Sequence, residues 1–315
     1  MYFCALLAFY YDKKQLGMKK IRAAIAGYGN IGRHVLEALE ASVDFEVAGI
    51  ADPYLTDIPA EIKRYPVTNR LSTLPDVDVA ILATPSREVE KIAIESLESG
   101  VYTVDCFDIH NQIVDLHRSL DRVAKTNNTV AIIAAGWDPG SDSIVRALVE
   151  TMTPKGITYT NFGPGMSMGH SVAARSVSGV KAALSMTIPL GTGIHRRMVY
   201  VEIEEGRSID TVAAAIKRDD YFAHDETHVI QVDSVDDLSD MGHSVHIFRK
   251  GVAGKTQNQI IEYTMKINGP ALTAQILVAA ARATTRQQPG AYTLIEIPVI
   301  HLLYGDTENL IRKIV

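Results

Sequence analysis

The sequence predicts an α/β protein: a Rossmann-type, doubly wound parallel sheet followed by a second, α+β domain with a mostly antiparallel sheet. In the first half, apolar runs are nearly continuous and alternate with helical segments, as buried parallel strands require. A glycine pattern, Gly27-x-Gly29-x-x-Gly32, follows the first of these runs. In the second half, alternating apolar and polar runs separated by turn residues are typical of antiparallel strands.

The parallel sheet is expected to use five strands before residue 140. They are predicted at residues 21–26, 45–51, 77–83, 101–106 and 130–135. Helical segments follow at 33–41, in the stretch that comes after Thr84-Pro85-Ser86 and ends at 99, and at 116–125. Because strands and helices alternate, the helices are expected to cover both faces of the sheet.

The second half is expected to begin with a helix at 144–152 and to contain another near 211–217. Its strands are predicted at 157–162, 183–188, 198–203, 228–232, 244–249 and 260–267. A strong helix at 270–283 is expected to return to the first domain. The predicted division is an N-terminal extension at 1–17, a dinucleotide domain at 18–140, a second domain at 141–270 and a C-terminal segment at 271–315.

Composition limits the possible partners. The chain has 315 residues, a formal net charge of −6 and no block of Lys and Arg, so nucleic acid and anionic membranes are poor candidates. Cys4 and Cys106 are its two cysteines, which favours a reducing cytoplasm. No spacing typical of metal ligands occurs, and no metal is predicted.

Residues 1–17 are apolar at their start, but they lack a basic n-region and are too short to span a bilayer. Met18 stands directly before the first strand. We therefore expect an extension without function, the alternative being a short strand or contact segment added to the fold.

The glycine pattern predicts a dinucleotide site. Gly27 permits a tight turn, Gly29 lets a pyrophosphate approach the backbone, and Gly32 lets the helix pack close to the strand. The helix N-terminus adds unpaired N–H groups. The expected cofactor-binding residues are Gly27, Tyr28, Gly29, Asn30, Ile31, Gly32, Asp52, Thr84 and Pro85. The alternative is a flavodoxin-like sheet with an idle glycine turn.

Asp52 ends the second strand about twenty residues after the last glycine, where an acid bonds the adenosine ribose in this kind of site. That chemistry favours NAD, because a 2′-phosphate would be repelled. Lys63 and Arg64 are the nearby cations. The alternative is an acid that caps the turn before Pro53.

Four segments resemble the meso-diaminopimelate dehydrogenase family. They are Gly27–Asn30, Val104–His110, Ala135–Gly140 and Asn161–His170. The resemblance runs from about Met18 to the end of the chain. The form of the last segment, with residues 268–273, is most similar to the thermophile-type branch.

The resemblance implies reversible oxidative deamination of the D-centre of meso-2,6-diaminopimelate, in lysine biosynthesis. It also implies NADP as the usual cofactor, a homodimer, and a second domain that binds substrate and dimerises. One departure concerns Asp52-Pro53-Tyr54, which stands where family members usually carry basic residues. This departure favours NAD or dual use.

Asp108 and Asp138 are the acids expected at the reacting amine, and both are predicted to be catalytic. Each follows a parallel strand at its C-terminal end, where ligands bind in such sheets. Asp105 is a third candidate. For each acid, the alternative is a residue that caps a turn.

The remaining expected substrate contacts are Trp137, Phe162, Gly165, Met168, Gly169, Thr187, Arg197, His243 and Asn268. The glycine-rich segment can present backbone N–H groups to the reacting carboxylate. Trp137 and Phe162 are expected to exclude water, and Met168 to lie against the Cα hydrogen. Arg197, with Thr187, is expected to hold the distal carboxylate, whereas His243 and Asn268 follow from the resemblance. The alternatives are core packing and ordinary surface or loop positions.

Two competing functions stay open. One is a D-amino-acid dehydrogenase or imine reductase of the same fold, for which Arg197 would have no carboxylate to bind. The other is a dinucleotide-sensing regulatory protein with a degenerate site. The presence of both Asp108 and Asp138 argues against a sensor.

Overall fold

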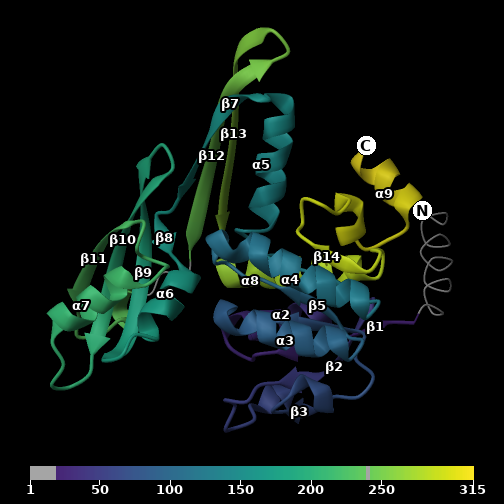
Figure 1. The fold of residues 1–315 in the computed structure, drawn as a ribbon, viewed down its shortest axis with the longest axis horizontal. Coiled ribbons are helices and arrows are strands. Elements are labelled where there is room, and N and C mark those ends of the chain that lie inside the picture. The colour runs from purple at the N-terminus through teal and green to yellow at the C-terminus, as the bar shows by residue number, and fades with distance from the viewer. Residues whose placement is uncertain (1–18, 239–241) are drawn as a thin grey trace, which may run out of the picture.

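The computed structural model describes residues 19–238 and 242–315, and the predicted N-terminal extension lies outside them. A seven-stranded parallel sheet has the strand order β14-β6-β5-β4-β1-β2-β3 (Figure 1). Its strands are β1 (Ile21–Ala26), β2 (Phe45–Ala51), β3 (Val67–Thr68), β4 (Val79–Leu82), β5 (Tyr102–Asp105), β6 (Val130–Ile132) and β14 (Gly290–Tyr292). This order reverses beside β1, so the predicted Rossmann-type fold is confirmed.

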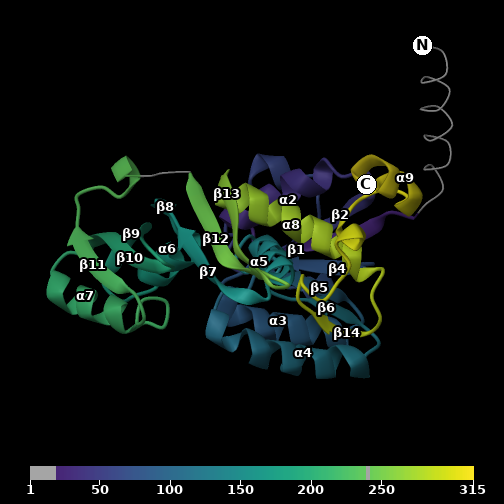
Figure 2. The same cartoon turned by 90° about the horizontal axis from the view of Figure 1, so that it is seen from above.

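Helices cover both faces of the parallel sheet. In Figure 2, α2 (Asn30–Glu40) and α8 (Gly269–Thr284) lie on one face, and α3 (Ser86–Glu98) and α4 (Ile113–Thr126) on the other. Each helix buries one apolar stripe. In α4, Leu116, Leu120 and Ala124 recur every four residues and pack into the core.

The second domain contains two sheets where one was expected. One has the order β11-β10-β9-β8 and the other β13-β12-β7. Their strands are β7 (Lys155–Phe162), β8 (Gly165–Met166), β9 (Val180–Gly191), β10 (Ile194–Ile203), β11 (Glu226–Gln231), β12 (His243–Ala253) and β13 (Thr256–Ile267). The pairs are antiparallel except β10 with β11, so the mostly antiparallel character is confirmed.

The chain passes from one sheet to the other at Gly163. Its φ is +91°, and a Cβ there would lie 2.2 Å from the Thr187 carbonyl oxygen. Only glycine permits so close a crossing. The strand pattern alone does not reveal this change of sheet.

Helices cover one face of each smaller sheet. Val145 of α5 (Ser141–Met152) packs with Val245 and Ile247 of the three-stranded sheet. Helices α6 (Met168–Arg175) and α7 (Ile209–Arg218) pack on the four-stranded sheet. Short 3-10 turns lie at Ala60–Ile62, Leu71–Thr73, His110–Gln112, Asp236–Leu238 and Val299–Leu302.

The C-terminal segment returns to the parallel sheet. Helix α8 packs beside α2, β14 pairs with β6, and α9 (Thr307–Ile314) ends the chain. Buried Arg282 on α8 forms an ion pair with Asp44, with 3.0 Å between Nη2 and Oδ1. The sequence did not predict β14, because three residues are too few to show a pattern. The domain boundaries themselves stay predictions.

Within residues 19–238 and 242–315, no helix is both long enough and apolar enough to cross a membrane. The same residues hold no group of three or more His, Cys, Asp or Glu side chains suited to a metal ion. The cytoplasmic location stays a prediction.

Candidate active site

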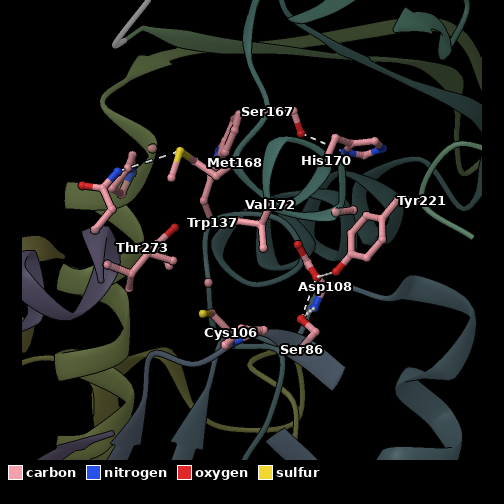
Figure 3. Close-up of a pocket in the computed structure, with 18 of the residues that line it drawn as sticks. Ser86, Cys106, Asp108, Trp137, Ser167, Met168, His170, Val172, Tyr221 and Thr273 are labelled. Carbon is pink, nitrogen blue, oxygen red and sulfur yellow. Dashed lines mark hydrogen bonds between the residues drawn. The ribbon is translucent and has the colours of Figure 1, made fainter. Parts of the chain in front are cut away.

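A cavity of about 690 Å³ lies where the parallel sheet meets the second domain (Figure 3). Its lining includes these predicted site residues: Gly29, Asn30, Ile31, Thr84, Pro85, Asp108, Trp137, Asp138, Phe162, Met168, Gly169, Thr187, Arg197 and His243. The other predicted site residues, Gly27, Tyr28, Gly32, Asp52, Gly165 and Asn268, are not part of the lining. The cavity thus brings the glycine loop and both candidate acids to one space.

The loop between β1 and α2 is shaped to receive an anion. Gly27 has a φ of +88°, and a Cβ there would lie 2.6 Å from the Ala83 carbonyl oxygen. A Cβ on Gly32 would meet Gly27 O at 2.0 Å. Gly29 is the N-cap of α2, and a Cβ there would meet nothing within 4 Å. Open space at a helix N-terminus fits a pyrophosphate, so these residues fit a dinucleotide.

Asp52 braces the glycine loop. Its Oδ2 accepts a hydrogen bond from Tyr28 N, and its Oδ1 accepts one from Tyr54 N, both at 2.8 Å. Arg64, one of the two expected cations, is paired with Glu40. Sequence reasoning missed Arg33, whose guanidinium carbon lies 5.7 Å from the centre of the Tyr28 ring.

Asp108 is held by side chains from both domains. Ser86 Oγ donates to Asp108 Oδ1 at 2.7 Å, and the Tyr221 hydroxyl donates to the same oxygen (Figure 3). Burial, and then the charge of Asp108, raise the pKa of Tyr221 above its usual value. The tyrosine is therefore a hydrogen-bond donor at neutral pH. Gly169 permits this approach, because a Cβ there would lie 2.2 Å from Asp108 Oδ2.

Asp138 also lines the cavity, with its side chain largely buried. Its side chain is 6% exposed, and it is paired with Arg146 of α5. His110 Nε2 lies 4.0 Å from Asp138 Oδ2. Two carboxylates with cationic or hydroxyl partners therefore border one cavity, which suits the binding of an ammonium group.

Asp105, the third candidate acid, does not line the cavity. It is fully buried and accepts hydrogen bonds from Phe107 N at 3.0 Å and Ala134 N at 2.9 Å. Burial raises its pKa to about 6. Its contacts join the turns that follow β5 and β6, which makes it a structural residue.

Aromatic rings form one wall of the cavity. The ring of Trp137 meets Phe162 edge to face at 5.9 Å and His243 at 4.8 Å between centroids. Phe162 and His243 come from neighbouring strands of the three-stranded sheet, where β7 pairs with β12. The three rings give this side of the cavity an aromatic surface.

The glycine-rich segment was expected to form a nest of N–H groups. The structure instead places Gly165 in β8 and begins helix α6 at Met168. Met168 and Gly169 line the cavity at the N-terminus of α6, where free N–H groups gather. Gly165 packs against the loop at His243, since a Cβ there would lie 2.7 Å from His243 Nδ1. Asn268 caps α8 by accepting from Ala271 N at 3.3 Å.

Arg197 and Thr187 lie side by side on paired strands β10 and β9. The guanidinium donates to the Thr187 hydroxyl, and its Nε lies 2.5 Å from Asp225 Oδ2. Its charge is therefore already balanced within the protein. A substrate with a single carboxylate would not leave Arg197 without an anionic partner, so this residue discriminates less between substrates than the sequence suggested.

His170 is a cavity residue that the sequence reasoning missed. Its Nδ1 lies 2.8 Å from Ser167 Oγ, and its ring meets Tyr221 edge to face at 5.5 Å. Burial, with the charge of Arg197 next, lowers the pKa of His170 to about 3. The imidazole is therefore neutral at physiological pH and serves to support Tyr221.

Most of the partners missed from the sequence are far away along the chain. Tyr221 and Asp225 reach the site from the loop between α7 and β11, and no local motif marks them. For Ser86 and Arg146, the sequence did contain a local indication, because both lie near motifs already singled out. Ser86 follows the predicted Pro85, and Arg146 lies in the helix expected directly after the Trp-Asp-Pro-Gly segment.

The parallel sheet, the glycine loop and the acid-lined cavity together define a Rossmann-type oxidoreductase. A family model described as the diaminopimelic acid dehydrogenase C-terminal domain matches residues 136–269. A model described as a CoA binding domain matches residues 18–110. A meso-diaminopimelate D-dehydrogenase of Bacteroides fragilis is 62% identical over 299 residues, covering 95% of this chain and 100% of that protein. This chain belongs to the meso-diaminopimelate dehydrogenase family, so the predicted resemblance is confirmed.

More distant relatives agree with this placement. A meso-diaminopimelate D-dehydrogenase of Ureibacillus thermosphaericus is 33% identical, covering 94% of this chain and 100% of that protein. The structure of the Corynebacterium glutamicum enzyme in complex with diaminopimelate matches with a TM-score of 0.84 at 28% identity, covering 95% and 100% of the two chains. An engineered D-amino acid dehydrogenase bound to NADP+ matches with a TM-score of 0.86 at 27% identity, covering 94% and 100%. The branch within the family stays a prediction.

Proposed function

We propose that this protein catalyses the reversible, NAD(P)-dependent oxidative deamination of the D-centre of meso-2,6-diaminopimelate. The products are L-2-amino-6-oxopimelate, which cyclises to tetrahydrodipicolinate, and ammonia. In reverse, the reaction serves lysine biosynthesis. The observation that carries the proposal is the placement of Asp108 and Asp138 on one cavity beside the glycine loop. Membership of the family supplies the substrate.

The two acids have related roles in this proposal. Asp108 and Asp138 bind the ammonium group of the D-centre and orient its Cα hydrogen. The amine must lose a proton before hydride leaves Cα, because its lone pair forms the C=N bond. A carboxylate oxygen of Asp138 receives that proton from the amine nitrogen. The bound dinucleotide supplies the hydride acceptor.

Other residues place the two ends of the substrate. The N-terminus of α6, at Met168 and Gly169, receives the carboxylate of the D-centre. Arg197, Thr187 and His243 serve the distal L-centre, and Asn268 contributes there by capping α8, whose Gly269 lines the cavity. Trp137 and Phe162 keep bulk water from the reacting carbon, while Gly165 shapes the loop beside His243.

A spectrophotometric assay tests this proposal. The purified protein is mixed with NAD or NADP and with the meso or the L,L isomer of diaminopimelate, and absorbance is followed at the reduced-nicotinamide band. We expect turnover with the meso isomer and none with the L,L isomer. Binding of nucleotide without turnover would instead support the sensor function, and equal rates with both isomers would reject the assignment of the two ends.

A second candidate function is a broader D-amino-acid dehydrogenase. The pairing of Arg197 with Asp225 favours it, because the distal pocket is electrically balanced without a second carboxylate. Adding D-alanine to the same assay distinguishes the two. A kcat/KM for D-alanine close to that for the meso isomer would support the broader activity.

We propose further that the enzyme accepts NAD, alone or besides NADP. Asp52 places a carboxylate at the end of β2, where the adenosine ribose is bound in such folds. Arg33 acts in the opposite direction and favours NADP. No carboxylate partner of its guanidinium occurs among residues 19–238 and 242–315. An exposed cation beside the loop favours a 2′-phosphate.

The variant Asp52→Ala is expected to raise the ratio of kcat/KM with NADP to kcat/KM with NAD by at least about tenfold. The variant removes the repulsion between the carboxylate and a 2′-phosphate, which is equivalent to a shift of about one to two pKa units. Initial rates with both nucleotides measure this ratio. Asp57→Ala, an exposed acid on the following loop, is the matched control. An unchanged ratio in Asp52→Ala would mean that Asp52 does not contact the ribose.

The homodimer is also part of the proposal. The three-stranded sheet has one face against α5, and its other face carries Ile157, Tyr159, Phe248 and Ile260. Register places them together, because Phe248 pairs with Tyr159, and Lys250 with Ile157 and Ile260. The Ile157 and Ile260 side chains are 58% and 57% exposed. The same face also carries Lys250 and the His246–Glu262 ion pair. Exposed apolar side chains beside paired charges suit association with a second copy.

The variant Ile260→Asp is expected to convert the homodimer to a monomer, because burying a new charge in the interface costs desolvation energy even with Lys250 on the opposite strand. Sedimentation velocity measures the mass. The control is Ile311→Asp on α9, which is also exposed in the monomer at 49%. A wild-type monomer would overturn the proposed homodimer. A dimeric Ile260→Asp variant would show that this face is not the interface.

A further inference from the structure

Asp142 is a buried acid to which no role has been given above. It lies in the first turn of α5, four residues after Asp138. It is 0% exposed, and neither carboxylate oxygen has a hydrogen-bond partner among residues 19–238 and 242–315. An isolated buried carboxylate is costly to keep, so its presence needs an explanation.

The charges around Asp142 come from three elements. Asp138 precedes α5, Arg146 lies one helical repeat further along α5, and Tyr263 projects from β13. The pKa of Asp142 is raised to about 7. Burial is the largest cause, the charge of Asp138 also raises the pKa, and the charge of Arg146 partly offsets both. Burial, and then the charge of Asp142, also raise the pKa of Tyr263. His110 is a further titratable group, and it lies near Oδ2 of Asp138.

Asp138 and Asp142 are therefore two carboxyl groups that share one nearby arginine, Arg146. Arg146 forms its ion pair with Asp138 and a 3.3 Å hydrogen bond with Ser143 Oγ. Asp142 is left with no such bond. Repulsion between two acids is mutual, so the ionisation of Asp142 must change how firmly Asp138 holds a proton.

We propose that Asp142 is a positioning residue that controls the basicity of Asp138 through its own ionisation. This inference rests on the proposed role of Asp138. When Asp142 is protonated, Asp138 is a weaker base toward the substrate. When Asp142 is ionised, Asp138 is a stronger base.

The step affected is the deprotonation of the substrate ammonium. One N–H bond of the amine breaks, one O–H bond forms on Asp138, and the nitrogen keeps the electron pair. The negative charge of Asp138 is neutralised in the same step, so repulsion from ionised Asp142 is relieved. That relief is the driving force that Asp142 adds. No further reactant is needed.

The test compares pH profiles of kcat/KM for meso-diaminopimelate in the wild type and in Asp142→Asn. Asparagine copies the protonated acid at every pH. The ratio of wild type to variant is expected to rise from about one at pH 5.5 to about three- to tenfold at pH 8.5, the size that a change of up to one pKa unit in a base produces. The midpoint is expected near pH 7.

Two controls separate the possible outcomes. Glu150→Gln removes an exposed acid from the same helix and should leave the ratio at one across the range. Asp138→Asn should abolish turnover at every pH. If Asp138→Asn is fully active, the proposed function of Asp138 fails, whereas a pH-independent ratio for Asp142→Asn overturns the present inference alone.

A second measurement covers the case in which Asp142→Asn folds poorly. Difference infrared spectra of the wild-type protein between pH 5.5 and pH 8.5, with and without substrate, report protonated carboxyl groups directly. We expect protonated-carboxyl absorption at pH 5.5 that is lost in two steps in the free enzyme, one near pH 6 from Asp105 and one near pH 7 from Asp142. Only the second step belongs to the proposal, and it should be missing in Asp142→Asn. A wild-type protein without the second step would contradict the inference, since Asp142 would then be ionised throughout.

Discussion

Asp108→Asn is expected to lower kcat/KM for meso-diaminopimelate by about a thousandfold, within the loss of about 2–5 kcal/mol that follows when one partner of a buried charge pair is removed. Asp108 Oδ1 accepts from Ser86 and Tyr221, so its charge is fixed in place by donors from two domains. An amide keeps the shape but cannot bind an ammonium group as a carboxylate does. Steady-state rates at pH 8 measure the loss.

The matched control for this variant is Asp115→Asn, an acid on α4 whose side chain is 81% exposed. It should retain wild-type kcat/KM. Thermal unfolding of both variants should stay close to that of the wild type. A loss below tenfold in Asp108→Asn would show that Asp138 alone binds the reacting amine.

The second large effect concerns stability. Asp142 has a pKa raised from 3.8 to about 7 in the folded protein. Between these two values the folded state holds a proton that the unfolded state has lost. The stability contributed by the protonated acid is therefore lost as the pH rises from about 4 to about 7. At about 1.4 kcal/mol per pKa unit, the three-unit shift amounts to about 4 kcal/mol.

Asp142→Asn removes this dependence. Its stability relative to the wild type is expected to increase by about 4 kcal/mol between pH 4 and pH 8, since asparagine does not ionise. Urea unfolding at several pH values measures the difference. Glu150→Gln should show no such trend, and a constant difference between Asp142→Asn and the wild type would mean that Asp142 titrates normally.

The sequence predicted local features well, because local features depend on neighbouring residues. Gly27 has a positive φ and approaches the Ala83 carbonyl closely, Gly32 approaches the backbone of Gly27, and Gly29 borders open space. The parallel strands are buried and nearly continuous in apolar residues. Thus the Rossmann-type fold and the position of the loop followed from the residues themselves.

The contacts that complete the site depend on tertiary structure. Tyr221 is more than one hundred residues from Asp108, and its hydroxyl reaches the acid from the loop between α7 and β11 in the second domain. Asp225 reaches Arg197 in the same way. The division of the second domain into two sheets depends on the crossing at Gly163, where the contacting carbonyl is distant in sequence. Such pairings leave no local pattern.

The return of the C-terminal segment sets an order for the synthesis of this protein. Helix α8 covers the same face of the parallel sheet as α2, and β14 forms its edge beside β6. A ribosome that has released only the first 140 residues has therefore exposed an incomplete apolar core. The dinucleotide-binding half can complete its core only after α8 and β14 have left the ribosome. Its folding therefore ends after the second domain has been synthesised.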